Sequence, residues 1–219
     1  MDSKRRTILG ARAPVSGGAG IRDTEGGFVQ ERLVIPGESE DVRARRTRDA
    51  LAWALIDLMR QKTYDDISVQ DVCAHASIGR STFYAHFADK DEMFVRHIVL
   101  FGDMMGARLH WDAAANRYGF DLKFLLEHVH DMRAIYDSLA RSRKIDLITK
   151  VWQNKFAEGF ERCIVAARAG EPQPMPAALL AQHFAGTVIN LLTWWLDHHR
   201  PMEAAALDAQ FHRMIAGLR

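Results

Sequence analysis

The chain has 219 residues, of which 48% are hydrophobic and 26% are charged, and its formal net charge at pH 7 is +1. This composition is typical of an ordinary soluble protein of one or two domains. The near-neutral balance excludes a globally basic surface, so any contact with nucleic acid must come from a local patch.

Cysteine usage and hydropathy narrow the class further. The two cysteines, Cys73 and Cys163, have no partners at metal-site spacing, which indicates a reduced, cytoplasmic protein. The most apolar long segment, residues 184–196, is too short to span a membrane, and the first residues lack the apolar middle of a secretory signal. We therefore expect a cytoplasmic location and no membrane partner.

Residues 1–41 are predicted to form a disordered N-terminal arm. Gly-rich pieces alternate there with scattered charges, and no helical or strand period is sustained. Two other interpretations stay open. Translation could begin later, at a non-standard start such as Val34 or Val42, or the basic triplet Lys4-Arg5-Arg6 could contact nucleic acid.

From Val42 onward the hydrophobic pattern is helical. Leu51, Leu55 and Leu58 recur on one face and predict a first helix over about 42–60. No strand is predicted, so the expected fold class is all-α. The further helices are expected near 69–75 and 78–85, from Lys90, and over 120–139, 144–169, 177–199 and 201–218, with a Pro- and Gly-rich break at 170–176.

The helix at 69–75 has a well-defined predicted start. Ser68 is an N-cap candidate, and Asp71 at the third helical position completes a variant of the capping box. Ile67 and Val72 are spaced to form a hydrophobic staple. Because another short helix follows after a tight turn, the pair can form a helix-turn-helix, whose second helix enters the major groove of DNA.

This second helix has the composition expected of a DNA-reading element. Small polar residues (Gly79, Arg80, Ser81 and Thr82) form its first turn and allow a close approach to bases and phosphates. The guanidinium of Arg80 suits guanine or phosphate, and the hydroxyls here and on Tyr84 can donate to phosphate. The apolar positions are predicted to anchor the helix on the core: Ile78, Phe83 and Phe87.

Cations crowd two predicted helix starts. Arg45 and Arg46 lie at the start of the first helix, and Lys90 at the start of the fourth. A cation at a helix N-terminus is electrostatically unfavourable for the helix itself. Phosphates facing these positions would explain them, and a solvated charged end is the alternative.

Residues 43–96 resemble the N-terminal domain of the TetR (tetracycline repressor-like, TetR/AcrR) family of transcriptional regulators. The run Thr82-Phe83-Tyr84-Ala85-His86-Phe87-Ala88-Asp89-Lys90 is its most diagnostic stretch. The resemblance implies a three-helix helix-turn-helix DNA-binding domain over 42–88 and a helical effector-binding and dimerisation domain over 89–219. Carried over by position, the implied DNA contacts are Arg45, Arg46, Ser68, Gly79, Arg80, Ser81, Thr82, Tyr84, His86 and Lys90.

Two positions depart from the family pattern. Many members have Gly or Asn in the turn, where this chain has Ala76-Ser77, and Gly79 stands where Ser is frequent. Ser tolerates turn geometry less well than Gly, which puts the angle of the second helix in question.

The resemblance also implies the partners. A homodimer is expected to bind a partly palindromic double-stranded DNA operator as a repressor and to be released by a small-molecule effector. An activator or co-activator of the same fold that acts through a protein partner is the alternative. The implied dimer residues, which could instead fill the subunit's own core, are Phe184, Val188, Leu191, Leu192, Trp195, Leu207, Phe211 and Met214.

Aromatic and Met side chains in the C-terminal region are candidates to line the effector site, although core packing is the alternative for each of them. Such side chains favour an apolar or aromatic ligand. The candidates are Phe101, Met105, Trp111, Phe124, His128, Tyr136, Trp152, Phe156 and His183.

Metal, cofactor and enzyme motifs are absent from the sequence. His128 and His130 are two residues apart on a helix and do not share a face, and no His-Glu-x-x-His or cysteine pair occurs. No nucleophile elbow, phosphate-binding Gly loop or dinucleotide fingerprint is present either. We therefore expect neither a metal, nor a cofactor, nor an enzymatic activity. A helical binding module without DNA function would not need the crowded cations.

Overall fold

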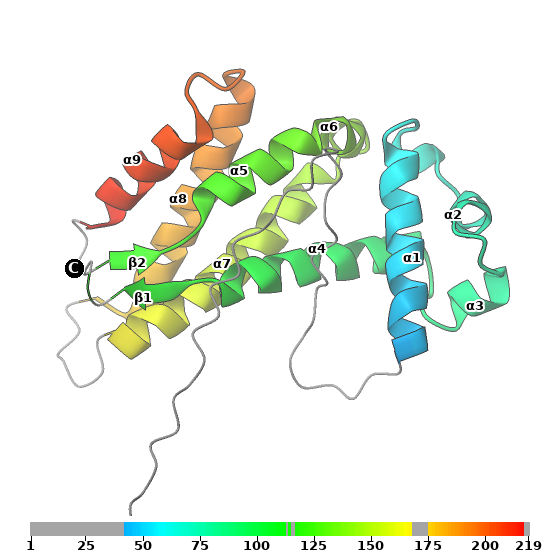
Figure 1. Ribbon diagram of the computed structural model, residues 1–219, viewed down its shortest axis with the longest axis horizontal. Helices are drawn as coiled ribbons and strands as arrows, with labels where there is room; N and C mark the ends of the chain where they lie inside the picture. The colour runs from blue at the N-terminus through cyan, green and yellow to red at the C-terminus, as the bar shows by residue number, and fades with distance from the viewer. Residues whose placement is uncertain (1–41, 113, 115–116, 168–174, 217–219) are drawn as a thin grey trace, which may run out of the picture. The chain divides into compact units, whose positions relative to one another are not determined.

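The computed structural model describes residues 42–112, 114, 117–167 and 175–216. The arm predicted at 1–41 lies outside the described residues, as does most of the break predicted at 170–176. The fold class is all-α, as predicted, with one small hairpin (Figure 1). The elements are α1 (Val42–Met59), η1 (Tyr64–Asp66), α2 (Val69–His75), α3 (Arg80–Tyr84), α4 (Lys90–Ala107), β1 (His110–Asp112), β2 (Arg117–Gly119), α5 (Leu122–Asp131), α6 (Arg133–Arg141), α7 (Ile145–Ala167), α8 (Ala177–Asp197) and α9 (Ala204–Ala216).

Helices α1 to α3 form the segment that we call the head. The predicted apolar face of α1 is buried, including Leu51 and Leu55, and packs with Phe83 and Phe87 in the same core. Helix α1 contacts α2, α4 and α6, so the head adjoins the remaining helices directly. The domain boundary expected at residue 88 stays a prediction.

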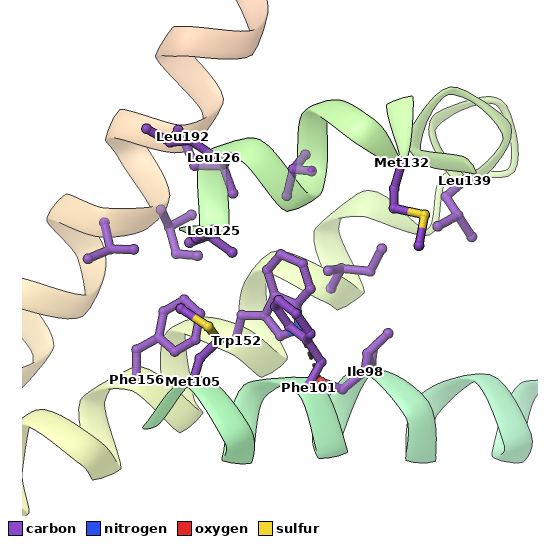
Figure 2. Close-up of a cluster of buried hydrophobic side chains, with 14 of the residues drawn as sticks. Ile98, Phe101, Met105, Leu125, Leu126, Met132, Leu139, Trp152, Phe156 and Leu192 are labelled. Atoms are coloured by element: carbon purple, nitrogen blue, oxygen red, sulfur yellow. Dashed lines mark hydrogen bonds between the residues drawn. The ribbon is translucent and has the colours of Figure 1, made fainter. Parts of the chain in front are cut away.

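The long helices of the remainder pack side by side. Helix α7 lies against both α4 and α8, and α5 lies against α9 (Figure 1). Between them Phe101, Met105, Trp152 and Phe156 are buried in a continuous apolar core (Figure 2). The indole Nε1 of Trp152 donates to the carbonyl oxygen of Ile98 at 3.0 Å, which satisfies the one polar atom of that ring.

The hairpin contradicts the expectation that the chain has no strand. Strands β1 and β2 pair antiparallel, with Trp111 opposite Tyr118 and their ring centroids 4.8 Å apart. A Cβ added at Gly119 would lie 2.4 Å from the ring of His110, so the His110 side chain occupies the space that glycine leaves free. Three-residue strands are too short for an alternating pattern to be recognised in a sequence.

A second difference lies at 120–139, where one helix was expected and two are found. Helices α5 and α6 are separated at Met132, which is buried and has φ −95° and ψ 18°. The hydrogen bond from the Met132 N–H to the His128 carbonyl oxygen, 3.1 Å, persists across the break. Neither Pro nor Gly occurs here, so the sequence carried no marker of the interruption.

In the part of the chain that the structure describes, no helix combines the length and apolar character needed to cross a membrane.

Candidate nucleic-acid interface and effector site

The start of α2 has the predicted capping box. The Ser68 Oγ accepts a hydrogen bond from the Asp71 N–H at 3.1 Å, and an Asp71 carboxylate oxygen accepts one from the Ser68 N–H at 2.8 Å. The hydrogen bonds from Ser68 lower the pKa of Asp71 to about 2. Because the Ser68 hydroxyl also donates to Asp71, its described partners are all local. A DNA contact of Ser68 stays a prediction.

The turn between α2 and α3 has the geometry of a glycine-containing turn, although its residues are Ala76 and Ser77. Ser77 takes a φ of 55°, in the left-handed region that favours glycine. The N–H of Ile78 donates to the Cys73 carbonyl oxygen at 2.9 Å and that of Ser77 to the Ala74 carbonyl oxygen at 3.2 Å. These two bonds are a Schellman motif, and Ile78 adds its apolar contact with the core. The turn therefore keeps the glycine-type conformation without glycine.

Helix α3 has one buried and one exposed side. Phe83 and Phe87 are buried, with ring centroids 5.7 Å apart, and hold the helix from behind. Half-buried His86 lies beside Phe87. On the other side five predicted contact residues are exposed together: Gly79, Arg80, Ser81, Thr82 and Tyr84.

Arg80 extends over its neighbour one turn away. Its guanidinium carbon lies 6.0 Å from the ring centroid of Tyr84, which is 51% exposed. Gly79 has an ordinary negative φ of −67°, and an added Cβ would meet only the hydroxyls of Ser81 and Thr82, at 3.8 and 4.0 Å. The backbone therefore does not require glycine at this position, and the missing side chain leaves the first turn of α3 open to approach.

Two arginines near the start of α1 are accessible. Arg46 is exposed and Arg45 half-buried, and neither forms an ion pair with any residue that the structure describes. The first turn of α1 contains no acidic residue. These guanidinium groups are thus able to meet an anion.

Lys90 has partners within the chain instead. Its ammonium donates to the carbonyl oxygens of Tyr64 at 2.6 Å and Ile67 at 2.7 Å, and it lies 4.1 Å from the ring centroid of Tyr64. Lys90 therefore attaches the start of α4 to the connection between α1 and α2. Two of the three N–H groups of the ammonium are used in these bonds, so at most one is left for the phosphate contact expected of Lys90.

Most of the residues expected to line an effector site come together between α4, α5, α6 and α7. Phe101 stacks on His128 with ring centroids 4.4 Å apart, and its ring is tilted against that of Trp152 with centroids 4.8 Å apart. The ring centroid of Phe124 lies 6.1 Å from that of His128, and the ring centroid of Tyr136 lies 6.2 Å from that of Trp152. Met105 and Phe156 are fully buried in the core, which agrees with the alternative that these side chains serve core packing.

Two of the expected residues lie elsewhere, and one was missed. Trp111 is on the hairpin beside Tyr118, and His183 is exposed on α8 next to Phe184. His97, which was not predicted, interacts electrostatically with His128. It precedes Phe101 by one helical turn, so the two side chains lie on the same face of α4.

The structure corrects the expected dimer residues. Six of them are buried inside the subunit because their side chains fill its own core, and in this conformation they cannot meet a second chain: Phe184, Val188, Leu192, Trp195, Leu207 and Phe211. Of the two others, Leu191 is half-buried and Met214 is 47% exposed.

In a comparison with known proteins, the sequence of the head and the start of α4 matches a family of regulators. Residues 54–96 match the family described as "Bacterial regulatory proteins, tetR family". Over 65 residues the chain is 40% identical to the HTH-type transcriptional regulator YxbF of Bacillus subtilis (strain 168). That alignment spans 27% of this chain and only 17% of the length of YxbF.

Solved structures show the same fold over most of the chain. A protein of Syntrophomonas wolfei assigned to the TetR family has a TM-score of 0.59 at 19% identity, over 78% of this chain and 95% of that one. The dihydroxyacetone kinase operon activator DhaS has a TM-score of 0.56 at 18% identity, over 78% and 95%. The flavonoid-responsive regulator FrrA has a TM-score of 0.55 at 17% identity, over 79% and 93%.

The sequence match lies on the segment that carries the helix-turn-helix, and the structural likeness extends to the helices that follow it. Residues 54–96 therefore match the tetR family of bacterial regulatory proteins, and the chain shares the fold of solved structures assigned to that family.

Proposed function

We propose that the chain is a transcriptional repressor that binds a palindromic DNA operator as a homodimer and is released by a small-molecule effector. The observation that carries the proposal is the exposed row Gly79, Arg80, Ser81, Thr82 and Tyr84, on a helix fixed from behind by buried phenylalanines. Such a row can enter the major groove while its supporting helix stays in place.

The chemistry of the row suggests a division of roles. Arg80 has the planar donor group that pairs with guanine, whereas Ser81, Thr82 and Tyr84 offer hydroxyls to phosphate oxygens. Arg45 and Arg46, accessible at the start of α1, add affinity that depends on salt and little on sequence. His86, half-buried beside Phe87, is at most a peripheral contact.

Homodimerisation is supported by apolar side chains on the outer faces of the last two helices. Leu179 and Trp194 on α8 and Met214 on α9 are 58%, 37% and 47% exposed. Exposed apolar groups of this size are typical of protein interfaces. A two-fold axis through these faces would present two heads to the two halves of a palindrome.

Release by an effector needs a connection between the aromatic cluster and the head, and α6 offers one. Tyr136 of α6 belongs to the cluster. Two residues on, fully buried Ser138 donates to the Lys62 carbonyl oxygen at 2.9 Å, and the Asp65 N–H donates to the Ser142 Oγ at 3.3 Å. An effector that moves α6 would therefore move the connection between α1 and α2 as well.

An activator is the second candidate. The observation in its favour is the similarity in fold to DhaS, which is named an operon activator.

The experiment is to select bound sequences from random duplex DNA with the full chain and then to compare variants on the selected site. We expect Arg80→Ala to weaken binding to the selected site by about 1–3 kcal/mol, or roughly 5- to 150-fold. Binding to other sequences should change little. Arg60→Ala, which removes an exposed arginine from the far end of α1, is the matched control. Failure to enrich any sequence would refute the proposal, and an equal loss on all sequences would make Arg80 a phosphate contact.

A further inference from the structure

Three polar side chains at the aromatic cluster lack hydrogen-bond partners among the described residues. They are His97 on α4, His128 on α5 and Tyr136 on α6, each half-buried. Within the described ranges no fully buried side-chain nitrogen or oxygen is left without a partner. The ring nitrogens of the two histidines and the hydroxyl of Tyr136 therefore keep some accessible surface and have no partner among the described residues.

The surroundings of these groups are flat aromatic surfaces. The rings of Phe101 and His128 are within 20° of parallel, and those of Phe124 and His128 within 17°. Trp152 lies beside Phe101, on the side of the cluster formed by α7 (Figure 2). These three rings pack against one another, so the three polar groups have aromatic surroundings.

The same groups are uncharged at neutral pH. Burial lowers the pKa of His97 to about 4, and burial together with His97 lowers the pKa of His128 to about 4. Burial raises the pKa of the Tyr136 hydroxyl above its usual range. Arg108 is a cation beside the cluster, and its guanidinium carbon lies 4.8 Å from the ring centroid of Phe124.

We propose that the effector is an uncharged planar aromatic compound with hydroxyl or carbonyl groups, bound at the aromatic cluster and hydrogen-bonded by His97, His128 and Tyr136. The inference rests on the proposed function, since it concerns the effector of that regulator. A neutral imidazole donates from one nitrogen and accepts at the other, so two of them and a phenol can pair with hydroxyl and carbonyl groups alike.

Other ligand classes fit these observations less well. A fully apolar molecule would remove three polar groups from water without giving them partners, which costs about 1–3 kcal/mol for each. A carboxylate or an ammonium would lose its hydration next to these uncharged groups, which costs more than burying a neutral polar group.

The test measures binding of three probes to the full-length protein by titration calorimetry at pH 7. Naphthalene, 2-naphthol and 2-naphthoate share one ring system and differ in their polar group and charge. We expect 2-naphthol to bind roughly 10-fold more tightly than naphthalene, because two new hydrogen bonds contribute about 0.5–1.5 kcal/mol each. 2-Naphthoate is expected to bind more weakly than 2-naphthol.

Variants locate the hydrogen bonds. Tyr136→Phe and His97→Phe should each weaken 2-naphthol by about 2- to 10-fold and leave naphthalene unchanged. The matched control is Tyr118→Phe, which removes a hydroxyl from the hairpin, outside the cluster. Thermal unfolding of each variant checks that the fold is retained.

Several outcomes would overturn the inference. Equal affinity for naphthalene and 2-naphthol would make the site merely apolar, and tightest binding of 2-naphthoate would make it an anion site. Binding of none of the three probes also contradicts it. Operator binding, measured on the same samples, separates these failures from failure of the proposed function, which would appear as loss of DNA binding whatever the probes do.

Discussion

The ammonium of Lys90 joins the start of α4 to the connection between α1 and α2. It bonds the carbonyl oxygens of Tyr64 and Ile67, and the Tyr64 ring beneath it carries a hydroxyl that donates to Asp91. Lys144, at the start of α7, approaches the same carboxylate at 3.3 Å. Burial lowers the pKa of Lys90, and Asp91 offsets this only in part. The side chain thus stabilises the junction between the head and α4.

Lys90→Met tests this role against DNA contact. We expect the free energy of unfolding to fall by about 1.5–3 kcal/mol, because two carbonyl oxygens lose a charged donor. The salt dependence of operator binding should stay unchanged. The control is Lys150→Met at an exposed position on α7. Unchanged stability with a salt slope lower by about one counterion would instead show that Lys90 contacts phosphate.

The unpartnered histidine His97 predicts how stability depends on pH. Burial depresses its folded-state pKa to about 4, whereas the unfolded value is about 6.5. Between these values the unfolded state binds the additional proton, so the free energy of unfolding should fall as the pH is lowered from about 6.5 to 4. One such group contributes at most about 1.4 kcal/mol per pH unit.

Urea unfolding at several pH values, with wild type and His97→Phe side by side, measures this effect. The variant should show the shallower loss of stability on the acid side. His212 acts in the opposite direction, because its hydrogen bond with Asp208 raises its pKa and this contribution is lost as the pH rises. Identical acid slopes in wild type and variant would show that His97 is not buried as a neutral group.

Sequence reasoning identified the exposed row of α3 because its first turn is small and polar, its apolar positions recur at helical spacing and its sequence resembles a known family. It missed His97, since a lone histidine on an apolar helix carries no pattern of its own. It also assigned Phe184 and Trp195 to the dimer, because periodicity shows that a face is apolar but not which partner covers it.

At the scale of elements, helix starts were predicted more easily than interruptions and ends. Ser68 and Asp89 indicate the starts of α2 and α4, because such side chains accept hydrogen bonds from the N–H groups of the first helical turn. Three helices end without glycine, with Ser77, Arg143 and His199 in the left-handed region at φ of 55°, 54° and 53°. Backbone hydrogen bonds make these ends, so the residue types give little indication of them.

Ser77→Gly should make the turn between α2 and α3 more stable. Glycine adopts a φ near 55° without a Cβ clash, and we expect the free energy of unfolding to rise by about 0.5–1 kcal/mol, since the gain exceeds its greater freedom in the unfolded chain. Chemical denaturation measures this. The same substitution inside α3, Ser81→Gly, should lower stability by about 0.5–1 kcal/mol. A loss with Ser77→Gly would mean that the turn is not strained.

At the scale of the whole molecule, the proposed regulator needs two copies of the chain. Its head has one α3, and a palindromic operator offers two half-sites. The buried residues of α8 and α9 already serve the subunit's core, which leaves their outer faces for the partner. Linking two heads makes the second contact with DNA intramolecular and raises the overall affinity by about 100-fold or more.

Trp194→Asp therefore separates dimer formation from folding. The indole is 37% exposed on α8, so a carboxylate there would be desolvated only in the dimer. We expect the wild type to sediment as a dimer at micromolar concentration, the variant as a folded monomer, and operator affinity to fall by about 100-fold. Val165→Asp changes an apolar residue that is 57% exposed on α7, and it should remain a dimer. A dimer of undiminished stability in Trp194→Asp would move the interface away from the outer face of α8, because two buried carboxylates cannot meet across a two-fold axis without cost.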